Sequence, residues 1–284
     1  MFSANIANTT DINLWEKSFL WQNAMAGGSR IRRYHKKRYI FVRTNSTTWW
    51  LFVICMKKIV FIVNPISGGK SKEKIVSLID QNIDRDRYQY KVIYTKGPAD
   101  ATVIARNCDA DIVVAVGGDG TVSEVATGLV GTDKALGIIP CGSGDGLALH
   151  LGISRNPLKA IKALNDAVIM TADSAVLDGK PFFCTCGAGF DALVGWNFAK
   201  AHSRGLMTYV KEAVKAWFGY RPDHYVIKTD DQTWEGDALI VTVGNASQWG
   251  NNARITPLAS MTDGLLDVTV VKPFSVLWMP SLAV

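Results

Sequence analysis

After Met56, short runs of β-branched residues alternate with stretches of helical spacing, and no other feature of the sequence constrains its fold as strongly. Alternation of this kind is typical of βαβ units on a parallel sheet. Residues 56–166 are therefore predicted to form a doubly wound α/β domain. The expected strands are 59–63, 90–95, 111–116 and 135–139, and the expected helices are 71–80, 99–107 and 121–129.

The rhythm changes beyond residue 166, where strand-like segments predominate. A second, mainly β, sandwich-like domain is therefore predicted over 167–284. Its apolar tail at 273–284 ends without a polar cap, so we expect the domain to be incomplete there. The tail either packs on a missing continuation, which we favour, or touches a membrane. The expected strands are 168–177, 181–186, 225–229, 238–243 and 265–271, with one helix at 204–218.

The helix expected at 204–218 places six apolar side chains on one face by their 3.6-residue spacing. Packing into the core is the default interpretation of this face. A lining for acyl chains is the alternative. The six residues are Leu206, Tyr209, Val210, Ala213, Val214 and Trp217.

The net charge of +6 comes from the first 55 residues. They hold eight of the 31 Lys and Arg residues and two of the 25 Asp and Glu residues, which leaves 23 of each sign in the rest. The body of the protein has no bulk attraction to polyanions, so no nucleic acid is expected as a partner. We expect 1–55 to be a poorly ordered leader without function, with a membrane-surface arm as the alternative. Its apolar run at 49–56 is far short of the ~20 residues needed to span a bilayer.

Three glycine-rich turns, at 64–70, 117–121 and 142–146, follow three of the expected strands. Parallel strands bring such turns to the same edge of the sheet, where ligands bind in α/β folds. Glycines there let backbone N–H groups approach phosphate oxygens, and the N-terminus of a following helix adds partial positive charge. The turns therefore predict a phosphate-bearing nucleotide. Thr121 and Glu124 have capping-box spacing, which predicts a helix that begins at Thr121.

Asp119 lies inside the second glycine turn, where its charge would repel a phosphate unless a cation lies between them. Mg²⁺ is the expected cation, because it prefers one or two carboxylates together with substrate phosphates. The alternative is an Asx turn in which the carboxylate stabilises its own loop. A Walker A loop and a dinucleotide fingerprint are excluded, since neither glycine pattern occurs.

With these motifs the chain resembles the diacylglycerol kinase catalytic-domain family, which includes bacterial lipid kinases and the sphingosine and ceramide kinases. The resemblance extends from about Lys57 to Val284. The Asp119 loop is also shared with NAD kinases and phosphofructokinases, but the ordered set of motifs is specific to the lipid-kinase group. The motifs are Asn-Pro-x-Ser-Gly at 64–68, Gly-Gly-Asp-Gly-Thr at 117–121, Pro-x-Gly-Ser-Gly at 140–144, Gly-x-Gly-Phe-Asp at 187–191 and Pro-x-Ala-x-x-x-Asp-Gly-x-Leu-Asp at 257–267.

The resemblance implies a two-domain kinase that holds ATP in its first domain and admits a lipid through the cleft toward the second. It implies a structural Mg²⁺ at Asp263, with carbonyls near Ser260 and Leu265; a tight turn at Asp263-Gly264 is the alternative. It also implies that Asp119 can act as the catalytic base, as in sphingosine kinases. The residues that it assigns to the nucleotide are Asn64, Ser67, Gly68, Thr95, Gly117, Gly118, Asp119, Gly120, Thr121, Gly142, Ser143 and Gly144.

Two departures from the family pattern bear on the reaction. Many bacterial members carry Asn-Asp where this chain has Asp145-Gly146, which leaves the acceptor open between a diacylglycerol-like and a sphingoid lipid. Bacterial members also carry an Asp-Gly-Glu motif whose Asp resembles a general base, and no Asp-Gly-Glu occurs here. A catalytically impaired nucleotide-binding protein is therefore one alternative. An NAD kinase of the same fold is the other, disfavoured because no Asn-Glu pair follows the Asp119 loop.

Composition and the resemblance together set the expected location and partners. With 48% hydrophobic and 20% charged residues, the chain is not predominantly disordered. Five thinly spread cysteines suit a reducing cytoplasm. A kinase of phospholipid metabolism must reach its lipid, so we expect a cytoplasmic protein at the periphery of the inner membrane, which docks transiently because its body is neutral. A homodimer is left open.

Overall fold

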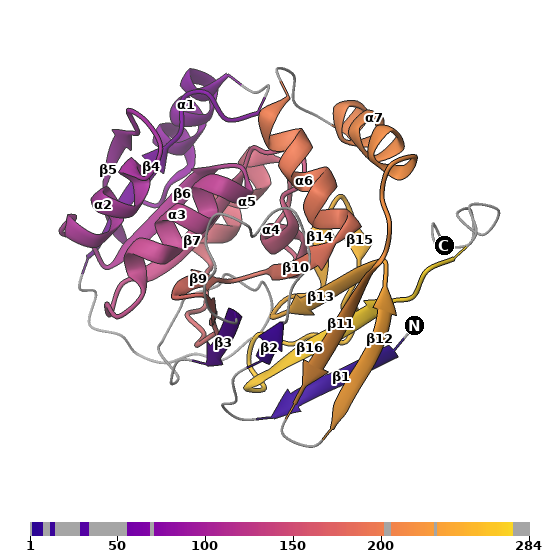
Figure 1. The fold of residues 1–284 in the computed structure, drawn as a ribbon. Helices are drawn as coiled ribbons and strands as arrows, with labels where there is room; N and C mark the ends of the chain where they lie inside the picture. Colours follow the sequence, from indigo (N-terminus) through magenta and orange to yellow (C-terminus); the bar gives the residue numbers. More distant parts are fainter. Residues whose placement is uncertain are drawn as a thin grey trace.

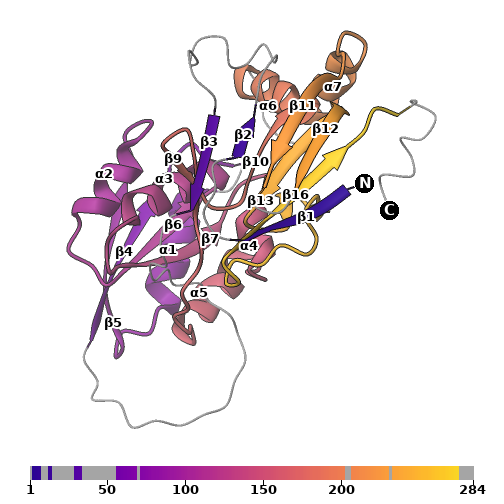
Figure 2. The same cartoon turned by 60° about the horizontal axis from the view of Figure 1, so that its bottom comes forward.

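The computed structural model contains an α/β domain and a mainly β domain, which lie side by side (Figures 1 and 2). The residues that it describes are 2–7, 12–14, 29–33, 56–68, 71–201, 206–229 and 232–274.

The first domain contains a four-stranded sheet in the order β5-β4-β6-β7, in which every neighbouring pair is parallel. Helix α1 packs on α5, and α2 packs on α3. Figure 2 shows the sheet between these two helical layers. The prediction of a doubly wound α/β domain is confirmed. The elements are β4 (Lys57–Val63), α1 (Lys72–Asn82), β5 (Tyr88–Tyr94), α2 (Asp100–Asn107), β6 (Ile112–Gly117), α3 (Asp119–Leu129), β7 (Ala135–Pro140), α4 (Gly146–His150) and α5 (Pro157–Asn165).

Helix α3 begins at Asp119 with Gly118 as its N-cap, so the predicted start at Thr121 is wrong. The Thr121 hydroxyl accepts a hydrogen bond from the side chain of Asn64 instead of capping the helix. Gly117 explains the close fit, because a Cβ there would lie 2.4 Å from the Thr121 hydroxyl oxygen. The first turn of α3 is therefore part of the loop that follows β6.

The second domain is built on antiparallel strands, which confirms its prediction as a mainly β, sandwich-like unit. The segment predicted as one strand at 168–177 forms a strand only in its last three residues, and 181–186 divides between two strands. Helix α6 was not predicted, because its apolar residues are not confined to one face. The elements are β8 (Ala175–Leu177), β9 (Lys180–Phe182), β10 (Thr185–Gly189), α6 (Phe190–Lys200), α7 (Leu206–Trp217), β11 (Asp223–Lys228), β12 (Thr233–Ala238), β13 (Ile240–Gly244), β14 (Gln248–Gly250), β15 (Ala253–Arg254) and β16 (Leu265–Val271).

The described residues of the segment 1–55, which the sequence predicts to be a poorly ordered leader, form three short strands. Strand β1 (Phe2–Ala7) pairs with β16, as Figure 2 shows, while β3 (Ser29–Arg33) lies between β2 (Ile12–Leu14) and β8. Open sheet edges offer backbone hydrogen bonds whatever the side-chain pattern, which explains these pairings, and the poor order of 1–55 as a whole stays a prediction. The rest of 1–55 and the tail beyond Phe274 lie outside the described residues. None of the helices in the described ranges is long and apolar enough to cross a bilayer.

A polar contact and a glycine contact fix the two domains together beside the third glycine turn. Nδ1 of His150 on α4 accepts the Ser247 N–H at 3.1 Å and lies 2.9 Å from the Ser247 hydroxyl oxygen. Burial, aided by the charge of Arg254, lowers the pKa of His150. The lowered pKa favours the neutral ring, in which Nδ1 can accept the Ser247 N–H. A Cβ on Gly250 would lie 2.8 Å from the Gly144 Cα, so the turn and β14 touch backbone to backbone.

Candidate functional site

The three glycine turns meet at the carboxyl edge of the parallel sheet, where the sequence places them. A Cβ on Gly118 would lie 3.1 Å from the Cα of Gly142, which brings the second and third turns into contact. A Cβ on Gly68 would lie 1.7 Å from the carbonyl oxygen of Cys141, so the first turn touches the start of the third. Only residues without side chains permit approaches this close.

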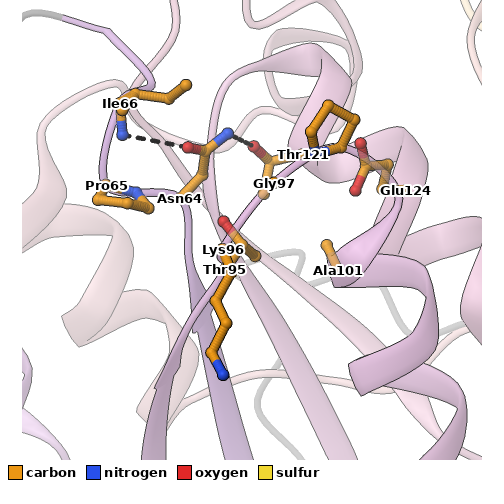
Figure 3. A pocket seen from close by; sticks show the side chains of 10 residues that line it. Asn64, Pro65, Ile66, Thr95, Lys96, Gly97, Ala101, Thr121 and Glu124 are labelled. Carbon is orange, nitrogen blue, oxygen red and sulfur yellow. Dashed lines mark hydrogen bonds between the residues drawn. The ribbon is translucent and has the colours of Figure 1, made fainter.

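A pocket of about 190 Å³ opens beside the first turn (Figure 3). The Asn64 side chain donates to the Thr121 hydroxyl at 3.1 Å and accepts the N–H of Ile66 at 3.1 Å, as the dashed lines in Figure 3 mark. The bond to Thr121 links the first turn to the second, and the bond from Ile66 lies within the first turn. The pocket is lined by Asn64, Pro65, Ile66, Thr95, Lys96, Gly97, Pro98, Ala101, Thr121 and Glu124.

A second pocket, of about 260 Å³, lies between the two domains. Its polar wall comes from the second and third turns, and its aromatic wall comes from α6, α7 and β14. The rings of Phe198 and Tyr209 meet edge to face with their centroids 5.7 Å apart. The lining residues are Asp119, Ser143, Gly144, Phe198, Tyr209, Trp249, Gly250, Asn251 and Ala253.

The Asp119 carboxylate reaches across to the third turn. Oδ2 accepts the N–H of Asp145 at 2.9 Å, and Oδ1 accepts the N–H of Gly146 at 2.8 Å. The carboxylate therefore organises the neighbouring turn and the first residue of α4, rather than only its own loop as the Asx-turn alternative holds. Burial raises the pKa of Asp119 above its ordinary value, although the Gly146 N–H opposes the rise.

Arg155 holds the third turn from its other side, although no sequence motif predicted this role. Its Nε donates to Asp145 Oδ2 at 3.0 Å, and its terminal nitrogens donate to the carbonyls of Gly142 and Ser143 and to the side chain of Asn251. The Asp145 side chain is 1% exposed, so this ion pair is buried on the acid's side. No local pattern marks Arg155, which lies ten residues from its acid in a chain with 31 basic residues.

Lys72, the first residue of α1, is a second cation at the turns that no sequence motif predicted. Its side chain is buried, with 3% of the residue exposed, and its ammonium donates to the carbonyl of Ser67. The Ser67 hydroxyl donates in turn to the carbonyl of Asn64 at 3.1 Å. A buried positive charge therefore lies directly behind the first glycine turn.

Asp191, the acid of the Gly-x-Gly-Phe-Asp motif, is a further buried group that received no role from the sequence. Burial raises the pKa of Asp191 to about 7. Gly187 makes room for it, since a Cβ there would lie 3.2 Å from Asp191 Oδ2. Burial also raises the pKa of Tyr209 in the second pocket, and the charge of Asp191 adds to that rise.

The predicted metal residues form a tight turn. Asp263 Oδ1 accepts the N–H of Leu265 at 2.9 Å, and Gly264 has a φ of 79°. Burial, with a smaller contribution from the Asp263 charge, raises the pKa of Asp267 to about 6. Across the described ranges, no group of three or more His, Cys, Asp or Glu side chains could hold a metal ion. A Mg²⁺ ion at Asp263 with carbonyls near Ser260 and Leu265 stays a prediction.

The residues predicted to contact the nucleotide divide between the two pockets. Asn64, Thr95 and Thr121 line the first pocket. Asp119, Ser143 and Gly144 line the second. The others belong to the turns and line neither pocket; they are Ser67, Gly68, Gly117, Gly118, Gly120 and Gly142.

Comparison with known proteins extends over most of the chain. The family model of the diacylglycerol kinase catalytic domain matches residues 58–177, and that of the YegS C-terminal NAD kinase beta sandwich-like domain matches 184–281. The "Probable lipid kinase YegS" of Salmonella typhimurium is 30% identical over 219 residues, which cover 72% of each chain. The diacylglycerol kinase of Bacillus subtilis is 27% identical and is matched over 74% of its length and 76% of this chain. A crystal structure of a diacylglycerol kinase from Bacillus anthracis superposes with a TM-score of 0.62 at 25% identity, over 80% of each chain.

Proposed function

Because the chain belongs to the diacylglycerol kinase catalytic-domain family, we propose that it is an ATP-dependent lipid kinase that transfers the γ-phosphoryl group to a hydroxyl of a diacylglycerol-like or sphingoid lipid. One observation carries the proposal beyond family membership. Asp119 lines the aromatic pocket between the domains and, through two backbone bonds, holds a glycine turn in contact with the other two. A single carboxylate thus adjoins both the expected phosphate site and the expected acceptor site.

The nucleotide lies, in this proposal, in the pocket beside Asn64 and Thr95, with its phosphates along the three glycine turns. The N-terminus of α3 supports this placement, because helix N-termini favour anions. The Lys72 ammonium behind the first turn adds positive charge on the same side. Catalysis of phosphoryl transfer depends chiefly on positioning the phosphates and neutralising their charge. The glycine turns, the α3 N-terminus and Lys72 would contribute both.

Asp119 also fits Mg²⁺, which prefers one or two carboxylates together with phosphate oxygens. It is the single acid among the described residues that line the second pocket. Each of its oxygens accepts one backbone N–H, so each retains a lone pair for a cation or a hydroxyl proton. When bound, Mg²⁺ would neutralise charge on the transferring phosphates.

The acceptor lipid lies, in this proposal, in the second pocket. Phe198, Tyr209 and Trp249 offer apolar surface to its hydrocarbon part, and Asp119 lies at the polar wall where the hydroxyl would enter. The raised pKa of Asp119 suits a general base, because proton transfer is most effective when the pKa of the base approaches the working pH.

Incubation of the chain with [γ-³²P]ATP and Mg²⁺ tests the proposal. Separate reactions contain dioleoylglycerol, sphingosine or NAD⁺, and the expected result is label in one of the two lipids. Label in NAD⁺ alone would identify an NAD kinase. ATP binding without label in any acceptor would identify the nucleotide-binding protein without catalysis, and either result contradicts the proposal.

A further inference from the structure

Helix α7 presents apolar side chains to solvent. The exposed fractions are 81% for Met207, 46% for Val210, 51% for Val214 and 87% for Phe218, which follows the helix directly. Their spacing of three, four and four residues places them on one face. We call these four residues the α7 stripe. Contiguous apolar surface of this kind marks an interaction site in a folded protein.

The opposite face of α7 packs against the protein. Ala216 is buried, and the Tyr209 ring contacts Phe198 of α6. The prediction that Val210 and Val214 share the core-packed face with Tyr209 is therefore wrong. The reason is that the apolar residues of α7 extend around more of its circumference than α6 covers, as its position at the margin of the molecule in Figure 1 illustrates.

Positive charge borders the α7 stripe. Lys211 and Lys215 follow the stripe along one flank and are exposed, and Arg221 is exposed three residues beyond Phe218. The acid of the same helix, Glu212, has its side chain 17% exposed and pairs with Lys215 at 2.8 Å. The border therefore retains net positive charge.

We propose that the α7 stripe docks onto an anionic lipid bilayer, with its four side chains in the headgroup boundary and Lys211 and Arg221 on the lipid phosphates. Apolar residues beside lysines are the pattern of helices that lie in a membrane interface, where basic residues add electrostatic attraction. A bilayer is favoured over a protein partner because α7 also carries Tyr209 into the second pocket. Docking would bring the mouth of the proposed lipid site to the membrane, so the choice of occupant rests on the proposed function.

Flotation with vesicles tests the docking independently of catalysis. The full chain is mixed, without nucleotide, with vesicles of phosphatidylcholine alone or of phosphatidylcholine with phosphatidylglycerol. The Met207→Ser/Phe218→Ser variant is expected to lose about tenfold or more of its vesicle affinity, because two of the largest inserting groups are removed. Lys211→Gln is expected to weaken binding only to vesicles that contain phosphatidylglycerol.

The matched control is Val103→Ser/Leu258→Ser, which removes apolar groups that are 57% and 75% exposed outside α7. This variant is expected to float like the wild type. Equal flotation of the α7 variant and the wild type would overturn the docking proposal. So would a dimer, seen by sedimentation velocity, that only the α7 variant dissociates, because a second copy would then cover the stripe. Vesicle binding that depends on the stripe in a chain without kinase activity would leave the docking intact and contradict only the proposed function.

Discussion

Replacing Gly68 by alanine is expected to weaken ATP binding by more than about tenfold, since the left-handed conformation alone costs a side chain roughly 1–2 kcal/mol. Gly68 has a φ of 61°, and a Cβ at this position would lie 1.7 Å from the carbonyl oxygen of Cys141. A methyl group cannot occupy that position, so the first turn must move away from the third. The phosphate site that the two turns form together would open.

The matched control for this change is Gly195→Ala. Gly195 lies inside α6, and a Cβ there meets nothing within 4 Å, so the substitution is expected to leave ATP affinity unchanged. It should stabilise the fold by roughly 0.5–1 kcal/mol through the better helix propensity of alanine. Isothermal titration with ATP and Mg²⁺ measures the affinities, and thermal unfolding checks that both variants are folded. Wild-type affinity in a folded Gly68→Ala variant would show that the first turn takes no part in binding.

Replacing Asp119 by asparagine is expected to reduce lipid phosphorylation at saturating ATP by ~10²–10⁴-fold, the usual contribution of a catalytic base. Asparagine keeps the size of the side chain but loses its charge. It also turns an amide toward the N–H of Asp145 or Gly146, where only an acceptor fits. The substitution therefore loses chemistry and also loosens the third turn, and the two effects need separation.

Arg155→Gln separates them. This change loosens the same turn by removing the bonds to Asp145 and to the carbonyls of Gly142 and Ser143, but it leaves the Asp119 carboxylate in place. If Asp119 acts in the reaction, Asp119→Asn loses far more kcat than Arg155→Gln. The loosened turn lowers ATP affinity in both variants, and loss of the Mg²⁺ ligand lowers it further in Asp119→Asn. Equal losses of kcat would mean that Asp119 only supports the turn, and another group would have to serve as base.

The α/β domain could be predicted closely because β4, β6 and β7 are short, mostly buried and separated by helices of clear period, while the edge strand β5 is only partly buried. The end of β7 fell within one residue of its prediction. The proximity of the three glycine turns could be predicted from the parallel sheet alone, because parallel strands have their carboxyl ends at the same edge of the sheet. The predicted start of α3 was wrong because the Thr121 side chain bonds to Asn64, which lies 57 residues earlier in the chain.

The rest of the site depends on contacts that no local pattern encodes. Arg155 and Lys72 reach the turns only through the fold, so no sequence motif predicts their roles. The aromatic wall of the second pocket likewise combines residues of α6, α7 and β14, which are separate in the sequence. The division of the predicted nucleotide residues between two pockets is likewise a property of the junction between the domains. Strand β1 pairs with a strand more than 250 residues later through backbone groups, so its side chains gave no signal.

A crystal structure of the chain with a non-hydrolysable ATP analogue and Mg²⁺ tests the central claim most directly. The prediction is a triphosphate in contact with backbone N–H groups of all three glycine turns, a nucleoside beside Asn64 and Thr95, and a terminal phosphate directed toward Asp119. A nucleotide bound away from these turns, or against only one of them with Asp119 remote from its phosphates, would contradict it.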